Sequence, residues 1–114
     1  MAVLDSQRLV PLPVRSLAAA GVVAGYTAIG TALTDSARIF FIQNLTDQII
    51  MISHDGVNDH YPLASGGFLL LDCTTNRDAN SVGFYIPQNT RIFAKRVGVP
   101  TTGNVYVTAF VGQG

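Results

Sequence analysis

The residues best suited to chemistry in this chain are two histidines and two aspartates in one short stretch. Three residues separate the pair His54 and Asp55 from the pair Asp59 and His60. A hairpin loop here would bring the two pairs to opposite sides of one turn. Two imidazoles and two carboxylates are donors that a transition metal such as zinc accepts, provided that all of them point to one centre. These four residues are the metal-site candidates of the chain.

The same stretch has a simpler interpretation as a solvated turn. The Asp-Gly pair at positions 55–56 is a typical hairpin signal, because glycine adopts the positive φ that such turns require. Asp55 and Asn58 are also residue types whose side chains commonly hydrogen-bond to the backbone of their own loop. The sequence favours this turn, and we assign no metal and no cofactor.

Other combinations of reactive side chains do not form a catalytic pattern. Cys73 is the only cysteine, and its sequence neighbours offer no group that would stabilise a thiolate. Ser53, His54 and Asp55 are adjacent on an expected strand, so their side chains alternate between faces and do not line up as a triad. The glycine pair in the stretch 64–67 lacks the following lysine and helix of a phosphate-binding loop. The sequence therefore predicts a protein that is not an enzyme.

The charge content excludes several kinds of partner and favours association between subunits. The 114 residues carry seven basic and seven acidic side chains, with Lys95 as the only lysine. A chain of this balance lacks the basic patch that nucleic acids or anionic membranes require. Charged residues make up 12% of the chain, against about 25% in ordinary soluble domains. So few charges would leave a free surface poorly soluble. We therefore expect a homo-oligomer or a subunit covered by neighbours.

The pattern of apolar and turn residues predicts an all-β chain. The chain has no glutamate, and its polar positions are mostly Thr, Asn, Asp, Ser and Gly, which are typical of strands and turns. Short apolar runs separated by turn signals indicate an antiparallel β-sandwich or a jelly-roll-like barrel. In the last run, odd-numbered residues share one face and even-numbered residues the other. The expected strands cover residues 38–43, 48–53, 61–63, 68–73, 82–86, 91–97 and 104–111, with one or two more within 14–33.

The first fourteen residues are expected to form an extended arm, followed by a single domain over residues 15–114. Pro11 and Pro13 remove backbone donors and hold this segment extended. The segment is also apolar, and an extended apolar arm is usually laid on another surface. We expect it to lie on its own domain or across an adjacent subunit. Candidate interface residues on the arm and on the strands are Val3, Leu4, Leu9, Val10, Leu12, Phe41, Tyr85, Phe93, Tyr106 and Phe110.

A ligand-binding role is the alternative from another functional class. Aromatic side chains at strand spacing could stack on a glycan or on a cellular receptor, although tryptophan, the strongest sugar-stacking residue, is absent. A small-molecule ligand is not expected. The aromatic candidates are Tyr26, Tyr61, Phe84, Tyr85 and Tyr106.

Several phrases of the sequence resemble small virion structural proteins of tailed bacteriophages. They include ARIFFIQNLTDQ at 37–48, ISHDGVNDH at 52–60 and LASGGFLLLD at 63–72. The resemblance continues through Gly83-Phe84, residues 89–92 with Lys95, and TGNVYVT at 102–108, although Asn89 stands where the pattern prefers glycine. It covers the chain from about Tyr26 to the end.

The resemblance implies a non-enzymatic virion component made in the cytoplasm of a bacterial host. Its partners would be other virion proteins, either the major capsid protein or connector and fibre proteins. Decoration of the capsid as a cement protein is the first role that it implies, and a head-to-tail connector, collar or tail-fibre anchor is the second.

Overall fold

The chain folds almost entirely into β-structure. The computed structural model describes residues 8–72, 86 and 88–113. These residues form two antiparallel sheets, and the helical structure within them is the single 3-10 turn η1 (Ala19–Gly21). Within the described part of the chain, no helix is long and apolar enough to cross a membrane. The all-β prediction is therefore confirmed.

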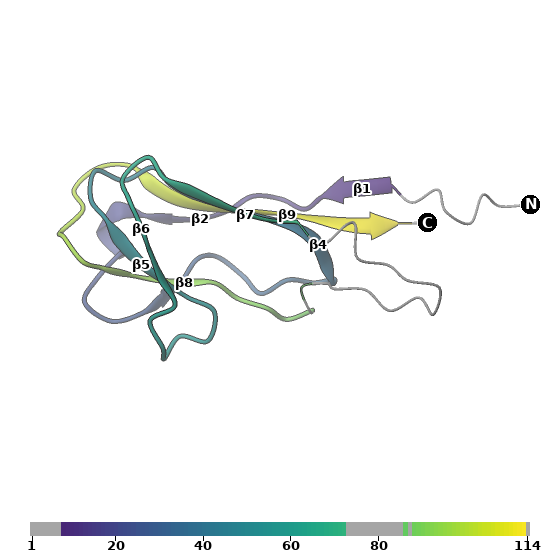
Figure 1. Ribbon diagram of the computed structural model, residues 1–114, viewed down its shortest axis with the longest axis horizontal. Coiled ribbons are helices and arrows are strands. Elements are labelled where there is room, and N and C mark those ends of the chain that lie inside the picture. The colour runs from purple at the N-terminus through teal and green to yellow at the C-terminus, as the bar shows by residue number, and fades with distance from the viewer. Residues whose placement is uncertain (1–7, 73–85, 87, 114) are drawn as a thin grey trace, which may run out of the picture.

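The larger sheet, called sheet A, contains the two longest strands of the described structure. Its order is β1 (Arg8–Pro11), β9 (Asn104–Gln113), β4 (Ala37–Asn44) and β7 (Phe68–Asp72). The strand β2 (Arg15–Ala18) pairs with β9 on the same side as β1. Figure 1 shows these strands running together as one layer.

The smaller sheet, called sheet B, has shorter strands and carries the loop with the two histidines. Its order is β3 (Thr27–Ala28), β8 (Phe93–Arg96), β5 (Ile50–Ser53) and β6 (Tyr61–Leu63). β5 and β6 form a hairpin whose connection spans residues 54–60. This hairpin is the one that the Asp-Gly signal predicted.

The strand pairs are nested along the chain. β5 pairs with β6, β4 with β7, β3 with β8 and β2 with β9, so each pair encloses the one before it in sequence. Successive pairs belong alternately to sheet B and sheet A. Both sheets are thus built from strands of the two halves of the chain.

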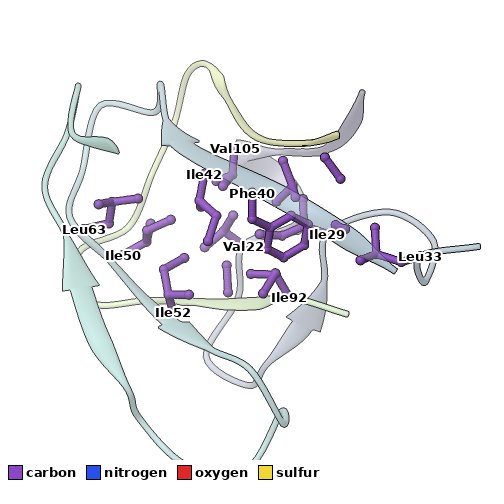
Figure 2. Close-up of a cluster of buried hydrophobic side chains, with 14 residues drawn as sticks. Val22, Ile29, Leu33, Phe40, Ile42, Ile50, Ile52, Leu63, Ile92 and Val105 are labelled. Atoms are coloured by element: carbon purple, nitrogen blue, oxygen red, sulfur yellow. The ribbon is translucent and has the colours of Figure 1, made fainter. Parts of the chain in front are cut away.

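The hydrophobic core lies between the two sheets. Phe40 and Ile42 of β4 meet Ile50 and Ile52 of β5, and each of these side chains is at most 1% exposed (Figure 2). Burying one such side chain contributes about 1.5–3 kcal/mol. The rest of the cluster comes from both sheets and from the segments between them: Val22, Ile29, Leu33, Ala37, Leu63, Ile92, Ala94, Val105, Val107 and Ala109.

The strands lie close to the predicted ranges, with the largest difference before residue 34. The segment 14–33, for which one or two strands were expected, contains β2, η1 and β3. Of the expected strand 82–86, residues 82–85 lie outside the described residues. Ile86 forms an isolated bridge with Ala37.

The predicted arm is partly a strand. Residues Arg8–Pro11 pair with β9 as β1, and the Leu12 N–H donates to the Ala109 carbonyl at 2.8 Å. Pro11 is tolerated because β1 is an edge strand, where a missing donor costs little. The expected boundary at residue 14 therefore does not coincide with the start of the sheet. Residues 1–7, with Val3 and Leu4, lie outside the described residues.

Candidate interaction surface

The face of sheet A that points away from the core is largely apolar. Phe40 and Ile42 point inward, so their neighbours on β4 point outward. Phe41 lies opposite Leu70 of β7 and Thr108 of β9, which share its side of the sheet. We call this surface the outer face of sheet A. Its apolar members are Leu9, Pro11, Ile39, Phe41, Phe68, Leu70, Tyr106 and Phe110.

Several of these apolar side chains are open to solvent. Phe68 is 63% exposed, Leu70 51% and Leu9 46%. The rings of Phe41 and Phe68 contact each other with centroids 5.4 Å apart. Of the described residues that strand pairing assigns to this face, Asp72 is the charged one. Exposed apolar side chains gathered on one face of a sheet are typical of an interaction site.

The outward face of sheet B, in contrast, is covered in part by the loop that joins β5 and β6. The β5–β6 loop (residues 54–60) lies over β8, where Gly56 packs so closely on Phe93 that a Cβ would be 3.3 Å from the ring. Asp59 forms an ion pair with Lys95 at 2.9 Å and accepts a hydrogen bond from the Tyr26 hydroxyl. The Lys95 ammonium also lies 4.8 Å from the centroid of the Tyr26 ring. These contacts hold the loop against sheet B.

The β5–β6 loop is stabilised from within by Asp55. One carboxylate oxygen of Asp55 accepts hydrogen bonds from the N–H groups of Val57 and Asn58 at 2.8 and 2.9 Å. The Ser53 hydroxyl donates to the same carboxylate at 2.8 Å. Gly56 has a φ of 78°. Hydrogen bonds from the loop backbone hold the pKa of Asp55 well below its usual range. The turn interpretation is thus confirmed.

The two histidines close the β5–β6 loop. The His54 N–H donates to Nδ1 of His60 at 2.9 Å, and Nε2 of His54 lies 2.7 Å from the Tyr61 hydroxyl. The two imidazole rings meet edge to face with centroids 5.6 Å apart. Burial lowers the pKa of His54, the charge of His60 lowers it further, and Asp55 opposes both effects.

The metal-site candidates are therefore occupied with each other and with their neighbours. The Asp55 carboxylate binds its own loop, and the Asp59 carboxylate binds Lys95 and Tyr26. Within the described structure, no three His, Cys, Asp or Glu side chains are grouped closely enough to hold a metal ion. The geometry makes this cluster a closed, hydrogen-bonded loop.

We expect the β5–β6 loop to loosen as the pH falls below about 6.5, the ordinary pKa of histidine. A histidine whose pKa is lowered by folding stabilises the folded state above its unfolded pKa, and this contribution is lost as the pH falls. The His54 N–H, which donates to Nδ1 of His60 within the loop, reports on this loosening. Amide exchange at His54, measured by NMR from about pH 7.5 to 5, should accelerate severalfold beyond its intrinsic pH dependence.

The amide of Thr101 serves as the internal control. It donates to Asp47, whose pKa is lowered to about 2 by hydrogen bonds from Thr101. This carboxylate stays ionised between about pH 7.5 and 5, so the protection of Thr101 should remain constant. Equal behaviour of the His54 and Thr101 amides would contradict the role assigned to the histidines.

The outer face of sheet A gathers four of the predicted interface residues. Leu9, Phe41, Tyr106 and Phe110 come from three strands, and pairing aligns them on one surface. The aromatic candidates are not combined in the same way, because Tyr26 contacts the β5–β6 loop on sheet B. Phe84 and Tyr85 lie outside the described residues.

Three other predicted interface residues have different positions. Val10 lies opposite the buried Val111, on the inward side of sheet A, and Leu12 packs against the core. Phe93 lies beneath Gly56 of the β5–β6 loop. Within this chain, these three partly buried side chains contribute to internal packing, and their expected interface role stays a prediction. Apolar character alone could not distinguish the two uses.

Sequence reasoning missed Ile39, Phe68 and Leu70 as members of this surface. The sequence did indicate that these strands are apolar on both faces, through the apolar runs 39–42 and 68–71. Such strands need a cover on each side of the sheet. What was missing was the pairing partner that decides which face is inward.

Comparison with known proteins gives no relative for this chain. None of the family models, curated proteins or solved structures compared with it matches.

Proposed function

We propose that the chain is a non-enzymatic structural protein of a bacteriophage virion that decorates the capsid as a cement protein. The observation that supports this proposal best is the open apolar outer face of sheet A, which offers a docking surface. The resemblance of residues 37–72 and 102–108 to small virion proteins points the same way. The proposed partners are the major capsid protein and further copies of this chain.

We further infer that the two sheets form a β-sandwich with jelly-roll connectivity. A jelly roll has eight strands in two Greek keys, and β2 to β9 supply eight strands whose nested pairs alternate between the sheets. The strand β1 is then an addition at the edge of sheet A. Viral capsid proteins and lectins both use this architecture, so the surface and not the fold decides between them.

The N-terminal residues have a role in this proposal as a tie between subunits. β1 brings the start of the chain to the edge of sheet A, beside the outer face. Residues 1–7 precede it and include the apolar Val3 and Leu4. We propose that they contact an adjacent subunit in a virion assembled from chains made in the bacterial cytoplasm.

The proposed location in the virion can be tested by immunogold labelling of particles purified from lysed cells that carry the gene. We expect label distributed over the whole head, since a cement protein occupies repeated sites. Label confined to the neck or the tail would instead support the alternative of a head-to-tail connector, collar or fibre anchor. Particles that remain unlabelled, although the lysate contains the chain, would contradict both roles.

Removal of residues 1–7 should leave the domain folded and weaken its hold on the particle. Since β1 begins at Arg8, this deletion keeps every described strand, whereas removal of residues 1–13 also takes β1 from sheet A. We expect particles carrying the shorter chain to release DNA at a lower temperature than wild-type particles. If the shortened chain is incorporated into particles as well as wild type and DNA is released at the same temperature, residues 1–7 do not connect subunits as proposed. Thermal unfolding of the isolated variant provides the control for its fold.

A further inference from the structure

We infer that two copies of this chain pack against each other through the outer face of sheet A. The inference deepens the proposed function, on which it rests for its biological setting, and it names a second copy as the occupant of the exposed surface. Four observations carry it: the different covering of the two sheets, the area of the face, its charge and its twist.

The two sheets differ in how their outward surfaces are covered. Sheet B carries the β5–β6 loop, held down by the ion pair of Asp59 with Lys95 and by the contact of Gly56 with Phe93. Sheet A keeps Phe68 and Leu70 more than half exposed. The β5–β6 loop thus covers the part of sheet B around Phe93 and Lys95, whereas apolar side chains stay open on sheet A.

The outer face of sheet A is large enough for a specific pair. β1 and β2 pair with β9 on the same side and together supply eight residues, so with β9, β4 and β7 the sheet has four columns that average about eight residues. At about 3.4 Å per residue the face is about 27 Å long. Four strands at a spacing of about 4.8 Å make it about 19 Å wide. Two copies would bury about 1,000 Å² even without the relief of the side chains, the size at which an interface becomes specific. An interface of this size fits a reversible dimer.

The charge of the face is compatible with packing against itself. A two-fold interface brings the same surface of both subunits together, so a face rich in one charge would repel its copy. Among the described residues that pairing assigns to this face, the charged one is Asp72, at the last position of an edge strand. Arg38 stands at the bulge of β4, near the same end of the face, where pairing assigns it to neither side. The centre of the face around Phe41 and Thr108 is uncharged.

The twist of the sheet favours a second copy over an unrelated flat surface. Stacked sheets pack in alignment when their twists match, with strand directions about 30° apart and about 10 Å between layers. Two copies of one sheet have the same twist. The tilted pair of Phe41 and Phe68 offers an aromatic anchor of the kind that dominates interface energetics.

The experiment measures mass against concentration by sedimentation velocity on the full chain. Wild-type protein should shift from monomer to dimer over about a hundredfold range of concentration. Leu70→Asp should raise the dimer dissociation constant at least tenfold, because it buries a charge at the interface. Val57→Asp is the matched control: Val57 is 78% exposed on the β5–β6 loop, so its change should leave the dissociation constant unaltered.

A second variant, Phe68→Lys, introduces the opposite charge at the most exposed aromatic position of the face and should also weaken the dimer. Circular dichroism and the unfolding temperature check that both variants keep the fold. A wild-type chain that stays monomeric, or a dimer weakened equally by Val57→Asp and Leu70→Asp, would overturn the inference. A dimer sensitive to Leu70→Asp from a chain absent from virions would overturn the proposed function alone.

Discussion

Substitution of Asn44 by alanine is expected to lower the free energy of unfolding by about 3 kcal/mol. Asn44 is fully buried at the end of β4. Its amide nitrogen donates to the carbonyls of Gln48 and Leu63 at 2.9 and 2.8 Å. Its amide oxygen accepts from the Thr46 N–H at 3.1 Å and from the Thr46 hydroxyl at 2.6 Å. Alanine would leave these buried carbonyl, N–H and hydroxyl groups without the hydrogen bonds that the Asn44 amide provides.

Chemical denaturation of the Asn44→Ala variant measures this loss. The control is Gln43→Ala on the adjacent residue, whose half-buried side chain lies on the outward side of the same strand. We expect the control to cost less than about 1 kcal/mol. A similar cost for both variants would show that the Asn44 network contributes little.

Asn44→Asp provides a test of the same network through pH. An ionised carboxylate would face the carbonyl oxygens of Gln48 and Leu63, so folding should raise its pKa. A carboxyl group with a raised folded pKa stabilises the folded state when protonated, and this stability is lost as the pH rises. The loss in free energy of unfolding of Asn44→Asp relative to wild type should therefore shrink as the pH falls from about 7 to about 4.5.

Gly103→Ala should be the most damaging change, with a cost of about 3–5 kcal/mol. Gly103 has a φ of 87°, which favours glycine. A Cβ at this position would overlap the carbonyl oxygen of Leu45 and lie 3.0 Å from the Cα of Thr46. Both obstacles are backbone atoms, so neither can move aside as a flexible side chain would. The backbone at Leu45 and Thr46, against which Gly103 packs, is also held by the hydrogen bonds from Thr46 to Asn44.

Two other glycines separate the contributions of φ and of crowding. Gly66 has a φ of 77° with open space around its Cβ position, so Gly66→Ala should cost only about 1–2 kcal/mol. Gly25 has open space and no positive φ, and Gly25→Ala should change stability by less than about 0.5 kcal/mol. Thermal and denaturant unfolding of the three variants should rank them in this order. Equal costs at positions 66 and 103 would refute the assigned crowding.

The sequence allowed most strands of the fold to be predicted. The apolar runs around Phe41 and Leu70 and the alternation along residues 104–111 correspond to β4, β7 and β9. The Asp-Gly pair predicted the β5–β6 loop together with the role of Asp55. These features are encoded locally, in the period of apolar residues and in the φ that a turn requires.

Features that depend on distant partners could not be predicted in the same way. The alanine- and glycine-rich segment that contains β2 has weak local preference and becomes a strand by pairing with β9. The two prolines indicated an arm, yet Arg8–Pro11 pair with the same strand. Phe93 and Phe41 look alike in sequence, and only the position of the β5–β6 loop separates an internal ring from an outward one.

The nested pairing of the strands also sets an order for folding. The β5–β6 hairpin closes a short loop, whereas β2 and β9 join opposite ends of the chain. Since loop closure costs more entropy as the separation grows, we expect folding to progress outward from the hairpin, over milliseconds to seconds. Sheet A would be completed last, when β9 pairs with β2 and β4. A chain in which β9 has not yet paired would lack a finished docking surface, so that folding precedes assembly.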